Sequence, residues 1–279
     1  MGDCIHTLEA LVEHPAIVDF PELIAQAMVL QAHALQESGA SERALLAAEE
    51  ASSVVPDQSG QLRLKLQHSL ISTLAEKGEV EAAWREALVL DSLVSAESGA
   101  RVRGMAYWTI GNAAFMSGRV MEGVAYHRQA AAALAKAADV NMWAGFNKAA
   151  ANMRLEAGLV DSETLDCLQR AEVAISVSDG RQADRLEILL ARAQWEHASG
   201  NNEVAERKLR DVAAQAHELF PFIRGQALQL LADCVLKLGR RDEALRIARE
   251  SERIFQEAGA TERVTQLRLQ VDGILRGRG

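Results

Sequence analysis

The sequence predicts an all-α fold built from about six stacked helical hairpins, and three observations support this prediction. The 279 residues are rich in Ala and Leu, which favour helices, and include only four prolines. No run of β-branched and aromatic residues alternates with polar ones, so no strand is expected. A glycine recurs about every 40 residues, a spacing typical of helical solenoids, at Gly39, Gly78, Gly118, Gly158, Gly200 and Gly239.

The segment Gly225–Ser251 shows how one hairpin is encoded. Spacings of three and four place one apolar stripe on its first helix, formed by Leu228, Leu231, Ala232 and Val235. A second stripe follows, formed by Ala244, Leu245 and Ala248. Gly239 tolerates positive φ and can end the first helix, while Asp242 and Glu243 suit the first turn of the second. Each helix therefore has one face to bury.

The same pattern predicts a single solenoid over residues 1–279. Its six hairpins occupy residues 20–257 and pair 21–38 with 41–55, 60–77 with 79–95, 100–117 with 119–136, 140–157 with 161–178, 181–199 with 201–219, and 222–238 with 240–257. Residues 258–279 form a capping helix, about 261–275, and a tail. Residues 1–19 hold one short helix, which is either an N-terminal cap or the remnant of an upstream region. Gly2 lies 37 residues before Gly39, close to the spacing of the hairpin glycines, which suggests that the chain begins where a first helix has just ended.

Small or slender residues recur at two fixed offsets from the hairpin glycine. Seven residues before it stand Ala32, Ile71, Gly111, Ala151, Ala193 and Ala232. Five residues after it stand Ala44, Ala83, Gly123, Ala205 and Ala244. The fourth hairpin has Glu163 at the second offset and Thr164 next, which predicts one inserted residue in its turn. Small residues at both offsets allow the paired helices to approach closely.

This pattern resembles the tetratricopeptide (TPR) repeat over roughly residues 20–257, and Leu231–Leu245 is its best single instance. HEAT and armadillo repeats are the alternative, because repeats of about 40 residues exceed the 34 of a TPR unit. The recurring small residues, and the absence of the prolines expected of HEAT repeats, favour TPR. The resemblance implies a right-handed superhelix whose first helices line a concave groove.

Six residues before each hairpin glycine stands a polar residue, and the TPR resemblance implies that this position faces the groove. The residues are His33, Ser72, Asn112, Asn152, Gln194 and Asp233. An amide there can donate to a carbonyl and accept from an N–H of an extended peptide. The alternative is that these residues simply form the water-facing side of their helices.

Three further residues join this predicted peptide-binding set. Trp108 lies four residues before Asn112, and Phe115 lies three after it. Lys148 lies four before Asn152, a spacing that resembles part of a TPR carboxylate clamp, although neighbouring repeats lack the rest of that clamp. Trp108, Phe115 and Phe146 mark the apolar region that would supply much of the affinity. Four more aromatics could belong to a ligand pocket, but large aromatics at helical spacing are more often core residues, and we favour the core for Trp84, Tyr107, Trp143 and Trp195.

Several classes of function find no support in the sequence. It contains no phosphate-binding glycine loop and no catalytic or metal-binding motif, and its seven histidines are dispersed, so we predict no enzyme, no cofactor and no metal site. The net charge of −9 argues against nucleic acid as a direct ligand, and acidic neighbours balance the arginines around Arg240–Arg253. No apolar run is long enough for a membrane span. Cys4, Cys167 and Cys234 form no CxxC motif, and reduced thiols in a cytoplasmic protein are the simplest reading.

The long repeats and the register of Asn112 and Asn152 resemble the sensor domains of bacterial peptide-pheromone regulators, the Rap, Rgg, NprR, PlcR and PrgX group. The resemblance implies a linear peptide in the groove, a capacity to form a homodimer and a role in quorum sensing or transcription regulation. No helix-turn-helix domain is recognisable in this sequence, so the chain is expected to be a detached sensor or to act through a protein partner. The alternative is a constitutive scaffold for protein assembly.

Overall fold

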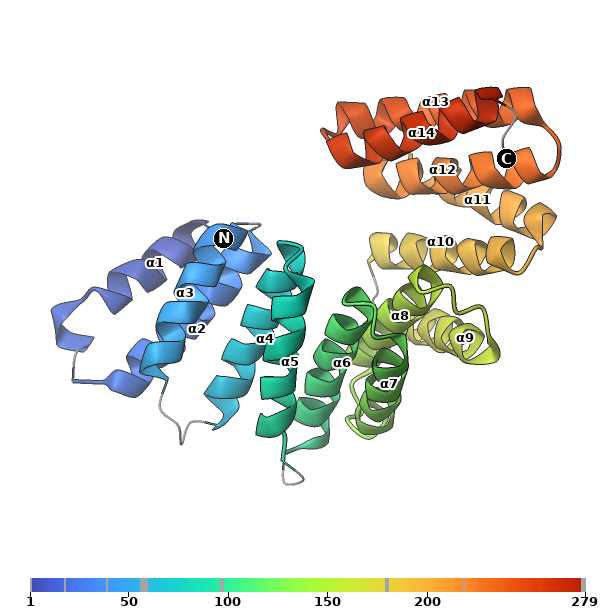
Figure 1. The fold of residues 1–279 in the computed structure, drawn as a ribbon. Coiled ribbons are helices and arrows are strands. Elements are labelled where there is room, and N and C mark those ends of the chain that lie inside the picture. Colours follow the sequence, from blue (N-terminus) through green and yellow to red (C-terminus); the bar gives the residue numbers. More distant parts are fainter. Residues whose placement is uncertain are drawn as a thin grey trace. The chain divides into compact units, whose positions relative to one another are not determined.

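A computed structural model describes residues 2–17, 19–38, 40–55, 60–95, 98–178, 181–217 and 219–276. Within these ranges all regular structure is helical, which confirms the predicted fold class (Figure 1). The chain forms two compact units, residues 1–139 and 140–279. None of the described helices combines the length and apolar content that a membrane span needs. That the two units continue one solenoid remains a prediction.

Unit 1 contains three helical hairpins preceded by a short helix. Its elements are α1 (Gly2–Val12), η1 (Pro15–Ile17), α2 (Pro21–Glu37), α3 (Ser41–Val54), α4 (Gly60–Glu76), α5 (Val80–Leu93), α6 (Ala100–Met116) and α7 (Val120–Leu134). Each hairpin pairs consecutive helices, and the first helices also pack on one another, α2 on α4 and α4 on α6. α1 packs on α2, and its Glu9 accepts a hydrogen bond of 2.6 Å from Arg43 of α3.

Unit 2 repeats this arrangement and adds one final helix. Its elements are α8 (Val140–Glu156), α9 (Ser162–Val177), α10 (Gln182–Ala198), α11 (Asn202–Ala216), α12 (Pro221–Lys237), α13 (Arg241–Glu257) and α14 (Thr261–Arg276). The first helices α8, α10 and α12 again contact one another in turn. α14 packs on α13 and buries Val264, Leu267 and Ile274.

The hairpin glycines end the first helices as predicted. Gly78, Gly118, Gly158, Gly200 and Gly239 have φ between +75° and +86°, a region that is costly for other residues. In the third hairpin, for example, Arg119 N–H donates to Ala114 C=O at 2.8 Å, the bond that closes a Schellman turn. Gly39 lies outside the described residues.

The third hairpin is packed through glycines. A Cβ atom added at Gly111 would lie 2.2 Å from Cδ2 of His127, and one added at Gly123 would lie 2.6 Å from the Phe115 ring. A Cβ at Gly104 would similarly meet the side chain of Leu134 at 2.5 Å. Since real side chains do not approach so closely, only glycine allows α6 and α7 to pack at this distance.

The fourth hairpin closes differently, around the buried Arg154. The inserted residue moves the start of α9 to Ser162, with Asp161 as its N-cap, and Thr164 takes the fully buried position that small residues hold elsewhere. Arg154 Nε donates to Thr164 Oγ1 at 2.9 Å, and its Nη2 donates to Asp161 at 2.9 and 3.0 Å. A charged side chain with an exposure of 3% is thus fully engaged in the turn.

Candidate functional site

A pocket of about 420 Å³ lies between α4 and α6 in unit 1. It brings together three predicted site residues, Ser72, Trp108 and Asn112. The full lining comprises His68, Ile71, Ser72, Ala75 and Glu76 from α4, and Met105, Trp108, Thr109, Asn112, Ala113 and Met116 from α6. Apolar atoms dominate its walls, with a few polar groups between them, and this composition is typical of ligand pockets.

The Asn112 amide is oriented by α7. Its Oδ1 lies 3.0 Å from Nε2 of the buried His127, whose ring occupies the space that Gly111 leaves open. Because Oδ1 can only accept, His127 Nε2 carries a proton and donates it. Asn112 Nδ2 makes no hydrogen bond within the described residues, so it is a donor available to a ligand.

His68 is the site residue that sequence reasoning missed. It lies ten residues before Gly78, the same offset that Trp108 and Lys148 have from their own glycines, and this register is the signal that could have found it. Its Nδ1 lies 2.6 Å from Thr109 Oγ1, and Thr109 Oγ1 donates to Met105 C=O at 3.0 Å. The single Thr109 proton is therefore used, so His68 Nδ1–H must donate.

The environment of His68 favours its neutral form. Burial, and then the nearby His33 of α2, lower the pKa of His68 below its ordinary value of 6.5. A neutral ring that is protonated at Nδ1 leaves Nε2 as an acceptor. His33 itself is exposed on α2 and does not line the pocket.

Phe115, another predicted site residue, does not line the pocket. It is buried, its ring centroid is 5.0 Å from that of His127, and it fills the space above Gly123. Phe146, in unit 2, is also buried, with its ring 6.1 Å from that of Trp143. Both side chains belong to helix–helix packing within their own units.

The remaining predicted residues stand on the first helices of unit 2. Lys148 Nζ donates to Asp184 Oδ1 at 2.7 Å and also to Glu187, both on α10. Burial lowers the pKa of Lys148, but these hydrogen bonds outweigh it and raise the pKa above 10.5. Asn152 and Gln194 are half-buried and make no hydrogen bond within the described part of the chain.

Asp233 is covered by the last helix. It accepts a hydrogen bond of 2.7 Å from Gln270 of α14. Burial raises the pKa of Asp233 above its ordinary value, while the bond from Gln270 opposes this shift. Unit 2 thus carries the predicted register, but two of its polar residues, Lys148 and Asp233, are already engaged by a neighbouring helix.

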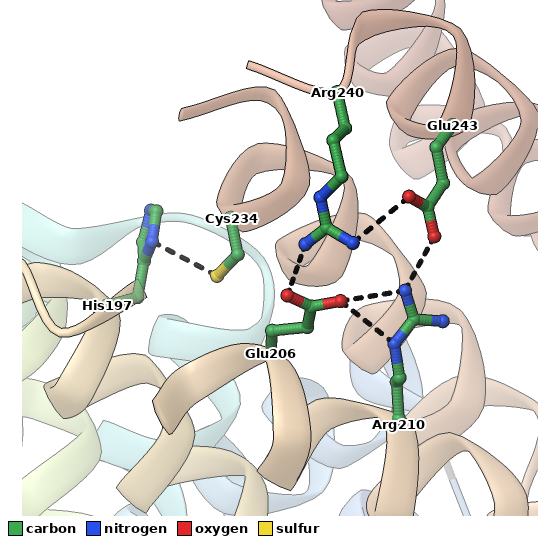
Figure 2. Close-up of polar contacts among 6 residues, drawn as sticks. All are labelled: His197, Glu206, Arg210, Cys234, Arg240 and Glu243. Carbon is green, nitrogen blue, oxygen red and sulfur yellow. Dashed lines mark hydrogen bonds and ion pairs between the residues drawn. The ribbon is translucent and has the colours of Figure 1, made fainter. Parts of the chain in front are cut away.

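A contact between Cys234 and His197 has the composition of a nucleophile–base pair (Figure 2). Cys234 Sγ lies 3.2 Å from His197 Nδ1, but Nδ1 also lies 2.7 Å from Asn202 Oδ1. Because Oδ1 only accepts, Nδ1 carries a proton and cannot take the thiol proton. Burial raises the pKa of Cys234 to about 12, and the residue has no exposed surface. The thiol is therefore not an activated nucleophile.

The other group in Figure 2 joins α11 to α13 by ion pairs. Arg210 donates to Glu206 at 2.8 Å and to Glu243 at 2.6 Å, and Arg240 pairs with the same two carboxylates. The hydrogen bond from Arg240 is the main cause that lowers the pKa of Glu206. Arg240 is thus held in the fold by carboxylates. Nowhere in the described ranges do three or more His, Cys, Asp or Glu side chains converge to hold a metal ion.

No protein-family model and no curated protein matches the sequence. Solved structures do match its fold. RapI in its apo form is 11% identical, with 91% of this chain and 72% of RapI covered and a TM-score of 0.69. A Rap protein complexed with competence and sporulation factor is 14% identical, with 90% and 70% covered and a TM-score of 0.66.

A putative kinesin light chain from Podosopora anserina, built of TPR-like repeats, is 20% identical, with 71% of this chain and 97% of that chain covered and a TM-score of 0.55. At these identities the likeness concerns the fold. The chain has the fold of a TPR-like helical repeat protein and resembles Rap proteins.

Proposed function

We propose that this protein binds an extended peptide, or an extended segment of a partner protein, along its first helices. The observation that carries the proposal is the pocket between α4 and α6, where apolar walls surround the oriented amide of Asn112. The Rap protein complexed with competence and sporulation factor supports it, because a protein of this fold there holds a separate factor. In line with the Rap-type resemblance, we infer a regulatory role in which the bound segment acts as a signal.

Polar and apolar groups of the pocket should contribute differently to the binding free energy. A micromolar ligand needs about 8 kcal/mol of net binding free energy. Each hydrogen bond contributes only about 0.5–1.5 kcal/mol after desolvation. Burying one large apolar side chain contributes about 1.5–3 kcal/mol. The pocket would therefore anchor the ligand, while the polar residues set its direction and register.

The test begins with a selection of random linear peptides on the full chain, followed by calorimetry of the selected peptides. Trp108→Ala should abolish measurable binding. Asn112→Asp should weaken binding at least several-fold, because it removes the Nδ2 donor while it keeps the oxygen that accepts from His127. Gln129→Ala, at an exposed site on α7, is the control and should bind like the wild type.

Two results would contradict the proposal. One is a selection that yields no linear peptide while folded proteins still bind, which is the behaviour of a constitutive scaffold. The other is an unchanged affinity in both Trp108→Ala and Asn112→Asp. For the regulatory role, light scattering with and without a selected peptide should show a change in oligomeric state or in capture of a protein partner.

A further inference from the structure

The pocket between α4 and α6 holds one acceptor and one donor whose orientations are set by other residues. This inference rests on the proposed function and specifies its ligand. We propose that the pocket binds an uncharged apolar residue of the peptide, with a backbone N–H donating to His68 Nε2 and a backbone C=O accepting from Asn112 Nδ2.

The acceptor is fixed by a chain of hydrogen bonds within the protein. Thr109 Oγ1 donates to Met105 C=O, so it must accept from His68 Nδ1. His68 Nε2 makes no hydrogen bond within the described residues and belongs to a side chain that lines the pocket. The ring therefore offers a lone pair, which matches a ligand N–H.

The donor is held in place by His127 of α7. His127 Nε2–H donates to Asn112 Oδ1. If the Asn112 amide turned over, its Nδ2 donor would face this N–H donor and the hydrogen bond would be lost, so the observed orientation is favoured. Asn112 Nδ2 therefore matches a ligand C=O. An acceptor and a donor that are both held in place lose little freedom on binding, which is the advantage of a preorganised site.

The remaining lining selects against charge. Ile71, Met105, Trp108 and Met116 supply apolar surface, and Glu76 is the charged side chain of the lining. Its carboxylate would repel an acidic ligand residue or a free C-terminal carboxylate. A neutral His68 offers no compensating positive charge. The pocket thus differs from a carboxylate clamp, which needs cationic donors.

Protonation of His68 would reverse its preference, because Nε2 would then donate. The titratable groups around it are His33 from α2 and Glu76 from its own helix, and α6 contributes no titratable side chain to the lining. Since burial and His33 both lower the pKa of His68, the neutral form persists below pH 6.5. Affinity for the N–H should stay constant above that lowered pKa and fall as pH decreases through it.

The test uses terminally blocked tripeptides as probes, Ac-Ala-Leu-Ala-NH2 and the same sequence with Asp in the middle. The indole N–H signal of Trp108, assigned with Trp108→Phe, reports occupancy of the pocket by NMR. We expect the leucine probe to shift this signal and the aspartate probe to bind at least about tenfold more weakly. Leucine probes in which one amide N–H is replaced by an ester oxygen should identify the N–H that His68 accepts, with about a two- to tenfold loss.

Two variants of His68 separate hydrogen bonding from packing. His68→Phe keeps a ring but no acceptor, so it should bind the leucine probe about two- to tenfold more weakly and without pH dependence. His68→Gln keeps an acceptor that does not titrate, so it should bind more tightly than His68→Phe and stay constant as pH falls. Thr109→Val, which releases the His68 ring, gives a second route if a His68 variant unfolds, and it should also weaken the probe.

The outcomes distinguish this inference from the proposed function. Equal binding of the leucine and aspartate probes, or an affinity indifferent to His68→Phe and Thr109→Val, overturns the inference. If longer selected peptides still bind and depend on Asn152 or Gln194, the proposed function survives that failure. If the leucine probe fills the pocket but none of the longer linear peptides binds, the inference stands and the proposed function fails.

Discussion

The helix pair α4–α6 in unit 1 and the pair α8–α10 in unit 2 carry side chains at the same offsets from their hairpin glycines, but these side chains have different surroundings. Trp108 and Lys148 both lie ten residues before their hairpin glycine, and Asn112 and Asn152 both lie six before it. In unit 1 these positions contribute to an apolar pocket. In unit 2 Lys148 is hydrogen-bonded to carboxylates of the adjacent helix. The register determines which helix face a residue occupies, while the neighbouring helix determines whether that face stays open.

The turns of the two hairpins differ in a related way. The third hairpin, in unit 1, brings α6 and α7 together by omitting side chains at Gly111 and Gly123. The fourth, in unit 2, fills its turn with Arg154 and satisfies that charge through Asp161 and Thr164. The packing of the third hairpin depends on the absence of side chains, whereas the turn of the fourth depends on the hydrogen bonds and ion pairs of Arg154. Substitutions should therefore affect the stability of the two hairpins differently.

The largest effect is expected at Arg154. Arg154→Ala removes the ion pairs from Arg154 to Asp161 and Glu163 and opens space beside Thr164, so the free energy of unfolding should fall by about 3 kcal/mol. Urea denaturation measures this loss. Arg154→Met keeps much of the side-chain volume but removes the charge, so it distinguishes the contribution of the ion pairs from that of packing. Arg119→Ala, which removes an exposed ion pair with Glu81, is the control and should cost much less. Equal losses in the two alanine variants would contradict the difference between the turns.

Gly111→Ala should have the next largest effect. The new Cβ would lie 2.2 Å from His127 Cδ2, so the ring must move and its bond to Asn112 must lengthen or break. We expect a loss of about 1–3 kcal/mol in unfolding free energy and a chemical-shift change at the Asn112 side-chain amide. Ala151→Gly, at the same register position in α8, is the reciprocal variant and should cost only about 1 kcal/mol. A Gly111→Ala protein with wild-type stability would show that close approach is not what this glycine provides.

Lys148→Met should mainly change how the free energy of unfolding depends on pH. Burial raises the pKa of Asp184, but the bonds from Lys148 and Arg181 outweigh this and lower it below 3.8. A lowered pKa gives stability that is present above pH 3.8 and is lost as pH falls through the folded-state value. Because the pair is partly exposed, the loss at neutral pH should be about 1 kcal/mol or less. Thermal denaturation from about pH 7 to 3 should show a shallower acid loss in Lys148→Met, and parallel curves would contradict this.

The smallest effect is expected at Ser69. Its hydroxyl is fully buried in α4 and has no hydrogen-bond partner among the described residues. Ala149 holds the equivalent position in α8. Ser69→Ala should therefore leave stability unchanged or raise it by up to about 1 kcal/mol. Thr73→Ala is the matched variant, because the Thr73 hydroxyl donates to Ser69 C=O and its loss should be destabilising. A clear loss in Ser69→Ala would mean that water or a ligand binds this hydroxyl.

Most of the fold could be predicted because it follows from local rules. Apolar spacing defines each helix, a glycine with positive φ ends each first helix, and small residues mark where pairs touch. Even the inserted residue before Thr164 is recognisable from the displaced register. The division of the chain after Asp139 could not be predicted, because it depends on how successive hairpins pack.

The site was only partly predictable because it depends on contacts between helices. The offset of six residues before the glycine selected Ser72 and Asn112, which the structure brings together in the lining of one pocket. The same reasoning included Phe115, but its side chain packs against Gly123 and His127 of α7 and does not line the pocket. It missed His68, whose role depends on Thr109 in another hairpin, and it gave no sign that Lys148 meets two carboxylates. A repeat pattern describes one hairpin at a time, whereas these contacts join two.

These same contacts have a consequence for how the chain folds. Among the described residues, the side-chain hydrogen bonds that reach furthest along the sequence span 41 residues, from His68 to Thr109 and from Gln270 to Gln229. Each hairpin therefore finds its partners within about one repeat, and a chain with such a low contact order folds quickly. On the ribosome, a hairpin could dock on the preceding hairpin of its own unit as soon as it has emerged. Synthesis and folding can then advance together, one repeat at a time.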